Sequence, residues 1–400
     1  MDTMKPKNSC LLATHHLRAW GGSELVVIEL AEALSQLGFE VDLFTPFYDE
    51  AFVEEAFNSL LTIHTDPKAI CLHQYDFVYT QHQTLNSILN VAPKNSLFEP
   101  SMPVLVYNHL SPYEPFEFPG PFVESLAADI ILANSCETQN KIKTCLNKER
   151  STSLFPNPAP RDFEQSPRPP EAKMPKALLA VSNHLPKEMG LALELLEDRG
   201  VAVTRLGRPG NCRRVQAEDI AAHDAVITIG KTVQYALRAR RAVFCYDHFG
   251  GPGWLADTAA LRAAEFYNFS GRCTPNKLDS AELADVIISG FSKAANFSSN
   301  LLDEDIRPYQ LEFQLRDLLA LVGSKYGRSR LSKTPAGQQA DFICKLSHEA
   351  EIYGLIDRHY EKMTNLTDQR TRLAQNLQRQ KNRSEHLQKK LDQKQNSGTA

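Results

Sequence analysis

Two adjacent glycines, Gly21 and Gly22, stand in the stretch "HHLRAWGGSE", between a short apolar run and a helical pattern. A glycine pair at the start of a helix lets a ligand approach the main chain, and the first N–H groups of the helix suit an anion such as a phosphate. The alternative is a tight turn without a ligand. Beside the glycines, His15, His16 and Trp20 are candidates to line a cleft, although the two histidines could equally end a strand.

A second turn of the same kind follows the apolar run "DAVITI" and contains Gly230, Lys231 and Thr232. A lysine beside the N–H groups of a helix start could meet the negative charge of a phosphate. The alternative is a solvated surface lysine. The turn is therefore a candidate phosphate site.

The stretch "YDHFGGPGW", residues 246–254, is the most unusual one in the second half of the chain. Its candidate binding residues are Tyr246, Asp247, Gly250 and Gly251. Its glycines and proline after a buried strand predict a loop at a donor site or a cleft. The alternative is a structural turn anchored by Trp254.

The elements around these residues alternate between strand and helix. Apolar residues recur at helical spacing from Ser23 to Leu37, between the apolar runs "CLLAT" and "FEVDLF". This pattern predicts a βαβ unit and a parallel sheet. Ligands bind beyond the carboxyl ends of such strands, so His109 and Ser135, which follow two further apolar runs, are candidates by position. A strand-end histidine and a helix N-cap serine are the alternatives.

Residues 156–175 contain seven prolines and are followed by a second series of alternating strand and helix patterns. We therefore predict an α/β protein with two Rossmann-like domains that face each other across a cleft. The predicted parts are a first domain at 1–160, a linker at 161–175, a second domain at 176–330 and a helical tail at 345–400.

The tail carries a heptad seam from Met363 to Lys394, and four of its ten positions are polar. Three states stay open: a helix that needs a partner, a coiled-coil dimer, and disorder. Residues 358–394 hold ten Lys or Arg against four Asp or Glu, and no aromatic follows Tyr360. This composition argues against nucleic-acid binding, because the stacking residues of single-strand binders are missing. A partner helix, a second copy or an anionic membrane surface remain as partners.

Composition restricts the remaining classes of function. The formal net charge is −4, and the eight cysteines show no C-x-x-C pair, which argues against a metal site or a disulfide framework. No apolar run is long enough for a signal peptide or a membrane-spanning helix. We therefore expect a cytoplasmic protein. A peripheral location at the inner face of the membrane is the alternative.

The combination of these motifs resembles GT-B glycosyltransferases, particularly those of family 4. The stretch "WGGSELVVIELAEALSQLGFEVDLFTP" is similar to the Gly-Gly-x-Glu loop, helix and strand that open that family. "ADIILANSCETQNKI" with "SLFPNPAP" is similar to its last first-domain strand and linker, and "DAVITIGKTVQYALRARRAVFCYDHFGGPGW" to its donor-side strand–loop–helix–strand. The resemblance covers about residues 10–290.

The resemblance implies a hexosyltransferase whose second domain holds a nucleotide-diphosphate sugar and whose first domain holds a glycan or lipid-linked acceptor. It implies a retaining mechanism without a metal ion or any cofactor besides the nucleotide-sugar. It places Arg205 and Arg208 against the diphosphate. It also implies that His109 is the catalytic residue, in contact with the transferred sugar or the acceptor, and that Glu24 helps to order the glycine loop.

One departure from the family leaves two interpretations open. Active members carry two glutamates on the donor-side loop and helix, and here Ile227 and Tyr235 fall at those positions. Either Lys231, Gln234 and Asp247 replace those contacts, or the chain is a catalytically inactive GT-B protein that acts as a binding or scaffold module through its tail.

Overall fold

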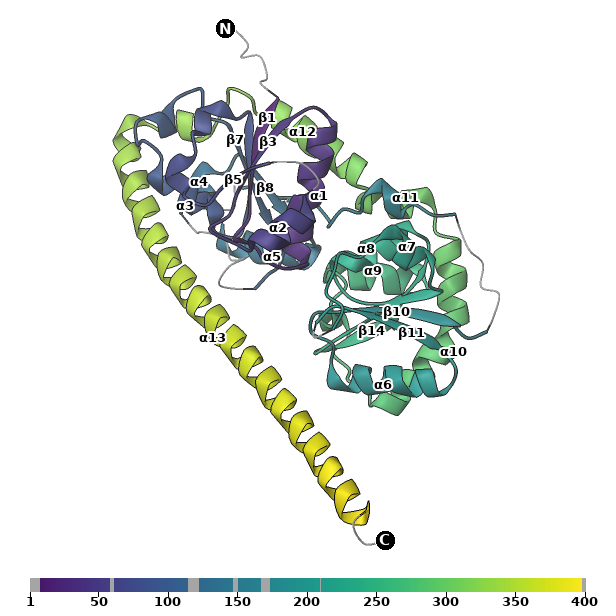
Figure 1. The fold of residues 1–400 in the computed structure, drawn as a ribbon. Coiled ribbons are helices and arrows are strands. Elements are labelled where there is room, and N and C mark those ends of the chain that lie inside the picture. Colours follow the sequence, from purple (N-terminus) through teal and green to yellow (C-terminus); the bar gives the residue numbers. More distant parts are fainter. Residues whose placement is uncertain are drawn as a thin grey trace. The chain divides into compact units, whose positions relative to one another are not determined.

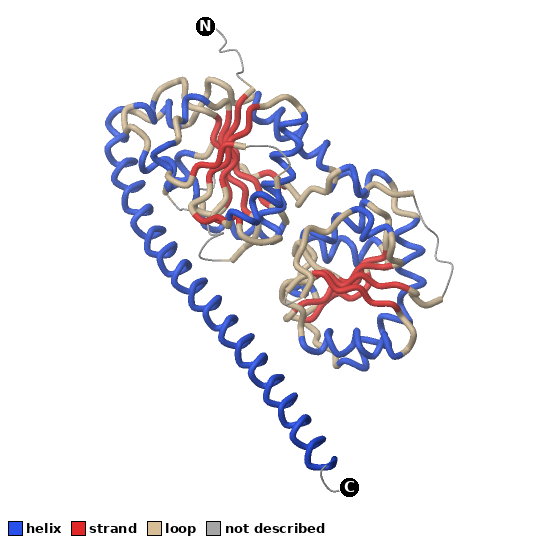
Figure 2. The backbone as a smooth tube through the Cα atoms, viewed as in Figure 1, coloured by secondary structure: helices blue, strands red, loops and turns tan. Residues whose placement is uncertain are grey.

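The computed structural model describes residues 8–57, 61–113, 122–146, 150–166, 173–208 and 210–397. Residues 167–172 of the predicted linker lie outside these ranges. The chain divides into two compact units, one that ends at Leu346 and one that begins at Ser347. The first unit contains two large β-sheets with helices on both faces of each, and a small sheet of β2 (His16–Leu17) and β4 (Phe47–Tyr48). The second unit is a stretch of one long helix (Figures 1 and 2).

The first sheet is parallel throughout, in the order β5-β3-β1-β6-β7-β8-β9. Its strands are β1 (Ser9–Ala13), β3 (Glu40–Phe44), β5 (Thr62–His64), β6 (Phe77–Gln81), β7 (Val104–His109), β8 (Ile130–Ala133) and β9 (Ser153–Leu154). Successive strand residues point to opposite faces, so Leu11 and Leu12 enter different cores. The helices that cover the two faces are α1 (Gly22–Gln36), α2 (Glu50–Ala56), α3 (Thr84–Val91), α4 (Val123–Ala127) and α5 (Cys136–Cys145).

The second sheet has the order β11-β10-β12-β13-β14 and is parallel except for β14. Its strands are β10 (Ala177–Val181), β11 (Ala202–Leu206), β12 (Ala225–Ile227), β13 (Ala242–Asp247) and β14 (Gly250–Trp254). The helices around it are α6 (Lys187–Asp198), α7 (Ala217–Ala221), α8 (Lys231–Arg238), α9 (Thr258–Phe266), α10 (Ser280–Ser299) and α11 (Asp303–Ile306).

Each sheet reverses its strand order at one point. In the first sheet the chain runs outward from β1 through β3 to β5 and then returns to β6 on the other side of β1. In the second sheet β11 lies on one side of β10 and β12 on the other. Ligands in such sheets bind beyond the carboxyl ends of the strands at this reversal. The ends of β1, β6, β10 and β12 are therefore the places to look for a site.

The chain returns to the first sheet after the second is complete. Residues 303–323 form two helices instead of one, because Pro308 separates α11 from α12 (Leu311–Gly323). Leu311, Leu315 and Leu318 of α12 pack in the same core as the residues of α1.

The last helix, α13 (Ala336–Ser397), begins within the first unit and continues through the second. Phe342 and Leu346 belong to the core on one face of the first sheet. The residues from Ser347 onward form the second unit. Among the described helices, none is long and apolar enough to cross a membrane.

Candidate functional site

A cavity of ≈ 450 Å³ lies at the strand reversal of the second sheet. The turns that follow β10, β11 and β12 line it, as do the start of α8 and, from the first sheet, the start of α1. Its polar lining residues include Ser182, Asn183, Arg213, Thr228 and Thr232. A concave site with a few convergent polar groups at such a reversal is where an α/β sheet binds its ligand.

Gly207 permits the turns after β10 and β11 to meet on the cavity wall. Its φ is +116°, and a Cβ atom there would lie 2.0 Å from the carbonyl oxygen of Ser182. Backbone atoms cannot yield as a flexible side chain does, so this close approach requires glycine.

We expect Gly207→Ala to lower the free energy of unfolding by about 2–4 kcal/mol, because it combines an unfavourable φ with a backbone clash. Gly200→Ala is the matched control, since Gly200 also has a positive φ of +87° but has no atom within 4 Å of the position that a Cβ would take. Urea unfolding of both variants measures the difference, and equal losses would show that the contact with Ser182 does not matter.

The start of α8 brings main-chain N–H groups to the cavity. Gly230 is the N-cap of α8 with a φ of 58°, and nothing lies within 4 Å of its Cβ position. Gly230, Lys231 and Thr232 all line the cavity. The first N–H groups of a helix have no acceptor within the helix and carry its positive dipole end, which suits a phosphate.

The ammonium group of Lys231 is bound to groups of the chain itself, whereas the sequence predicted a cation that faces a phosphate. Its Nζ atom lies 2.5 Å from the Glu29 carboxylate of α1 and also donates to the carbonyl oxygen of Pro158. Tyr235 donates to the same carboxylate. Lys231 and Glu29 have only 3% and 0% of their side chains exposed. Burial raises the pKa of Glu29 and lowers that of Lys231.

The sequence analysis did not single out Glu29, although a carboxylate among the apolar residues of a helix is a recognisable signal. Glu29 lies on the buried side of α1 among Val26, Leu30 and other apolar residues. A carboxylate in such a stripe needs a cationic partner, and here the partner comes from the other sheet. A neighbouring pair joins Arg214 to Glu32 of α1 through two hydrogen bonds of 2.7 and 2.9 Å.

Neither of the two arginines predicted at the diphosphate is among the residues that line the cavity. Arg205 makes two hydrogen bonds to Glu197 of α6, at 2.9 and 2.7 Å, on an exposed surface. Arg208 is exposed next to Gly207, and it is near enough to the start of α1 for its charge to oppose the rise that burial causes in the pKa of Glu24. Arg213, which was not predicted, does line the cavity, and its guanidinium group binds Asp219 through two hydrogen bonds.

Tyr246 and Asp247 lie at the carboxyl end of β13 and line the cavity, as the sequence predicted. Asp247 nonetheless has structural partners: its carboxylate accepts hydrogen bonds from Phe249 N at 2.8 Å, Ser270 Oγ at 2.8 Å and Gly271 N at 2.9 Å. The Tyr246 hydroxyl accepts a bond of 3.3 Å from Leu278 N. Burial raises the pKa of Tyr246.

Gly250 and Gly251 do not form the predicted cleft loop. They begin β14, which runs antiparallel to β13, and neither lines the cavity. A Cβ at Gly251 would lie 2.1 Å from the Cys245 carbonyl oxygen. Trp254 ends the strand and donates to the carbonyl oxygens of Val286 and Ile287 at 3.1 and 3.2 Å. The alternative of a structural turn anchored by Trp254 is therefore correct.

The glycine pair at the start of α1 accommodates a carboxylate of the chain itself. A Cβ at Gly21 would lie 2.5 Å from Glu24 Oε2, so the Glu24 side chain folds back over the helix start. Ser23 Oγ donates to Glu24 Oε2 at 2.8 Å. The nearest atom to a Cβ at Gly22 is Cβ of Lys231, at 3.8 Å, so Gly22 lies where α1 meets α8.

Three histidines gather at the strand reversal of the first sheet. His15 and His16 follow β1, and His82, which was not predicted, follows β6 with a φ of 56°. His15 Nδ1 lies 3.3 Å from His16 Nδ1, and His16 Nε2 lies 3.3 Å from Glu24 Oε1. His82 Nδ1 accepts a hydrogen bond of 3.3 Å from the backbone N–H of His15. The predicted cleft residue Trp20 lines the cavity and packs on Phe52.

Burial, together with the charges of His82, His15 and Arg18, lowers the pKa of His16 to about 3. The folded chain thus keeps His16 neutral where the unfolded chain protonates it, so stability falls as pH drops below the ordinary pKa of 6.5.

We expect wild type to lose about 1–2 kcal/mol more of unfolding free energy than His16→Gln between about pH 7.5 and about pH 5. Urea unfolding at the two pH values measures this difference. An identical pH dependence of the two proteins would contradict the assignment.

His109 is at the carboxyl end of β7 as predicted, but it does not reach the cavity, which corrects its predicted role as the catalytic residue. Its side chain is 0% exposed, and its Nε2 atom lies 2.8 Å from Oε1 of Glu124 on α4, itself 1% exposed. A histidine sealed against a carboxylate inside the first sheet's core cannot touch a ligand in the cavity. Leu110, one residue later, is the cavity-lining residue of this segment.

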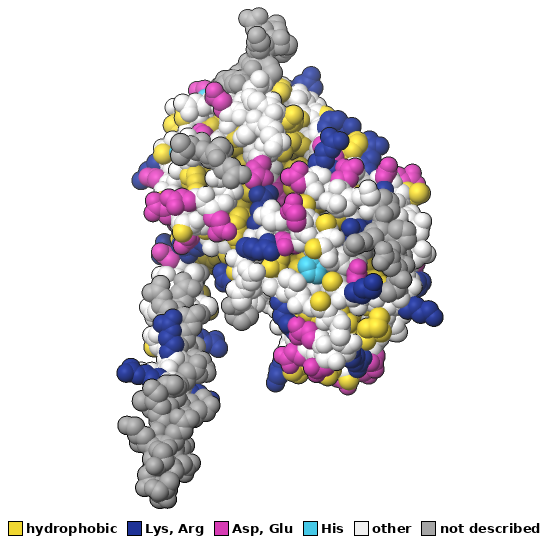
Figure 3. Space-filling view, turned by 45° about the vertical axis from the view of Figure 1, so that its right-hand side comes forward, with side chains coloured by type: hydrophobic (Ala, Val, Ile, Leu, Met, Phe, Trp, Pro, Cys, Tyr) yellow, Lys and Arg dark blue, Asp and Glu magenta, His cyan; other side chains and the backbone are white. Residues whose placement is uncertain are grey.

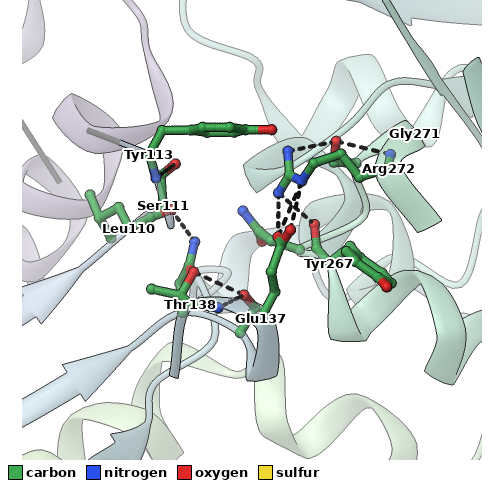
Figure 4. Close-up of polar contacts among 12 residues, drawn as sticks. Leu110, Ser111, Tyr113, Glu137, Thr138, Tyr267, Gly271 and Arg272 are labelled. Atoms are coloured by element: carbon green, nitrogen blue, oxygen red, sulfur yellow. Dashed lines mark hydrogen bonds and ion pairs between the residues drawn. The ribbon is translucent and has the colours of Figure 1, made fainter. Parts of the chain in front are cut away.

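Ser135 is the N-cap of α5, with its Oγ atom accepting a 3.2 Å bond from Thr138 N, so the N-cap alternative is correct. In the first turn of the same helix, Glu137 binds Arg272, which follows α9 on the second sheet (Figure 4). The shortest bond of this pair is 2.6 Å, and the guanidinium carbon lies 5.0 Å from the centre of the Tyr113 ring. Like Lys231 with Glu29, this pair joins residues of the two sheets.

Comparison with known proteins gives a likeness in structure alone. No protein-family model matches the sequence. No curated protein sequence matches it either. A glycosyltransferase from Rickettsia africae ESF-5 superimposes with a TM-score of 0.50 at 13% identity, covering 80% of this chain and 99% of that one. A protein described as a UDP-N-acetylglucosamine 2-epimerase from Listeria monocytogenes superimposes with a TM-score of 0.51 at 11% identity, covering 80% and 97%.

These superpositions extend over almost the whole of both known structures. They confirm the predicted fold class, an α/β protein of GT-B architecture with two Rossmann-like sheets and a C-terminal helical extension.

Proposed function

We propose that this chain is a glycosyltransferase that takes a sugar from a nucleotide-diphosphate sugar and passes it to a glycan or a lipid-linked acceptor. The donor binds in the cavity of the second domain (176–330), and the acceptor approaches from the first domain (1–160). The transfer retains the anomeric configuration and uses no metal ion or cofactor besides the nucleotide-sugar. A lipid-linked acceptor would bring the chain to the inner face of the membrane.

The observation that carries the proposal is the cavity of ≈ 450 Å³ at the carboxyl ends of β10, β11 and β12. The open side of Gly230 and the start of α8 face it, so main-chain N–H groups can hold the diphosphate. Such fixed donors stabilise the charge that builds on the leaving diphosphate without reorganising during the reaction. The two superimposed proteins support the ligand class, since one is a glycosyltransferase and the other is named for a UDP-sugar.

In this proposal, the cationic side chains that were expected to bind the diphosphate stabilise the structure around the cavity. Because Lys231 is bound to Glu29, it holds α8 against α1 and thereby fixes the N–H groups at the start of α8. The diphosphate then depends on those N–H groups and on polar side chains such as Ser182 and Thr232. Arg213 lies at the cavity with its charge shared with Asp219.

Turnover of a panel of UDP- and GDP-sugars by the full chain tests the proposal. We expect release of the nucleoside diphosphate from one donor, faster when an acceptor glycan is added. Release of UDP or GDP can be followed by a coupled assay, and the anomeric configuration of the product by NMR. Binding of a nucleotide-sugar without any release would instead support the catalytically inactive module, and a chain that binds none of them would contradict both.

A further inference from the structure

The second unit presents an apolar stripe along α13. Met363, Leu366, Leu373 and Leu377 are 63%, 51%, 69% and 70% exposed. These are large apolar side chains on a single helix, and they follow one another along it. Singly exposed leucines are common, but several large apolar side chains exposed on the same face of one helix mark an interaction surface.

The spacing of this stripe fits a second helix. The positions 359, 363, 366, 370, 373, 377 and 380 alternate steps of four and three residues, the a and d positions of a heptad. A strict a/d stripe is narrow and matches the seam of a coiled coil, whereas a helix that lies on a membrane needs a wider apolar face. The helix contains no Trp or Phe after Phe342 to anchor it in a lipid interface.

Arg370 interrupts the stripe between Leu366 and Leu373 at an a position. In a parallel dimer of this chain, each Arg370 would lie against its own copy in the middle of the apolar seam. Two like charges in that place repel, and taking both out of water adds to the cost. A helix with a carboxylate at the facing position would turn the same residue into an ion pair that fixes the register.

The charges beside the seam have one sign. In the heptad of residues 359–383, the charged residues at the e and g positions are Lys362, Lys381 and Arg383, all basic. The acidic residues of this stretch, Glu361 and Asp368, fall at position f, away from the seam. Lys and Arg side chains stand out along the described part of the helix in Figure 3. Residues at e and g select the partner in a coiled coil, so this face selects an acidic one.

We propose that residues 359–383 of α13 are the docking site for a helix of an acidic partner protein. This partner helix carries apolar residues in a heptad repeat, acidic residues at its e and g positions, and a carboxylate opposite Arg370. The inference concerns a surface outside the sugar site, so it does not depend on the proposed transferase activity.

A pair of designed peptides tests this docking site on the full chain. Both peptides have about four heptads with leucine at a and d and one glutamate at a central a position. One carries glutamate and the other lysine at every e and g position. We expect the acidic peptide to bind at least about tenfold more tightly by fluorescence anisotropy, and this preference to weaken between about 0.05 and 0.5 M salt.

Two charge reversals separate the seam from the general charge of the helix. Arg370→Glu should weaken binding of the acidic peptide by at least about tenfold, because it sets two carboxylates face to face. Arg379→Glu makes the same change in net charge at a c position and should have a clearly smaller effect. Both residues lie on the exposed helix outside the first unit, so thermal unfolding of that unit should not change.

Four results would overturn the proposal. The first is equal binding of the acidic and the lysine peptide, and the second is equal loss in the two charge-reversal variants. The third is a stable homodimer in sedimentation velocity that the acidic peptide does not dissociate. The fourth is binding of the wild-type chain to phosphatidylserine vesicles that outcompetes the peptide, which would assign the face to a membrane instead.

Discussion

Replacing Lys231 by methionine is expected to lower the free energy of unfolding by up to about 3–5 kcal/mol, because it leaves the buried Glu29 carboxylate with only the more distant Arg214, 3.9 Å away, as its cation. Glu29 is fully buried, and its partner Lys231 lies 202 positions away in the sequence. A methionine fills much of the space of the lysine side chain, so the loss reports the broken ion pair more than a cavity. Urea unfolding at neutral pH measures it.

The double variant Glu29→Gln with Lys231→Met is the matched control, because it removes both charges. It should recover a large part of the loss, since replacing a buried ion pair as a whole is far less costly than breaking it. The loss in Lys231→Met should also shrink at low pH, because burial raises the pKa of Glu29 and a protonated Glu29 needs no cation. A double variant no more stable than Lys231→Met would contradict this account of the pair.

Replacing Ile229 by glutamate is expected to weaken binding of a nucleoside diphosphate by about a hundredfold. Ile229 is half-buried, lines the cavity and precedes Gly230 at the start of α8. A carboxylate about 5 Å from the diphosphate repels it by about 3 kcal/mol at an effective dielectric constant near 20, which is about a hundredfold in affinity.

Ile229→Gln has nearly the same shape without the charge and serves as the control for this variant. We expect it to change the affinity by less than about tenfold. Calorimetric titration of both variants, after thermal unfolding has shown that both are folded, separates charge from shape. Equal affinities in the two variants would mean that the diphosphate does not lie at the start of α8.

The architecture could be predicted because the pattern of apolar residues within each short segment indicates a strand or a helix. Buried parallel strands such as Phe77–Gln81 and Val104–His109 are short apolar runs, and helices such as α6 follow a period of 3.6 residues. Alternation of the two patterns is enough to give a parallel sheet and the ends of its strands. Tyr246, Asp247 and Thr232 could therefore be placed near the cavity before their contacts were known.

The partners of charged side chains could not be predicted, because they come from residues far away in the sequence. From the sequence alone, nothing shows that Lys231 and Glu29 are partners; the structure shows that they pair because α1 and α8 pack together. His109 has the right position at the end of β7, but Glu124 on a different element decides what its ring does. The resemblance to family 4 named the types of group that a donor site needs and could not say which of them this fold had already paired.

The glycine pair near the N-terminus likewise has partners that its local sequence does not show. Its chemistry is that of close approach, as the sequence predicted, but the approaching groups belong to the chain: the Glu24 carboxylate at Gly21 and Lys231 at Gly22. The start of α1 thus serves contact between the two sheets, and the start of α8 offers its N–H groups to the cavity. A diphosphate at α8 and an acceptor near the histidines that follow β1 would then lie on the two sides of this contact.

Calorimetric titration of the unmodified full chain with UDP, GDP and ADP tests the central claim, that the cavity beyond β10 and β12 holds a nucleoside diphosphate. We predict that one of the three binds with a stoichiometry of one and that Ile229→Glu abolishes the heat while Ile229→Gln retains it. If the folded chain binds none of them, or if the binding is insensitive to Ile229→Glu, the cavity is not a donor site.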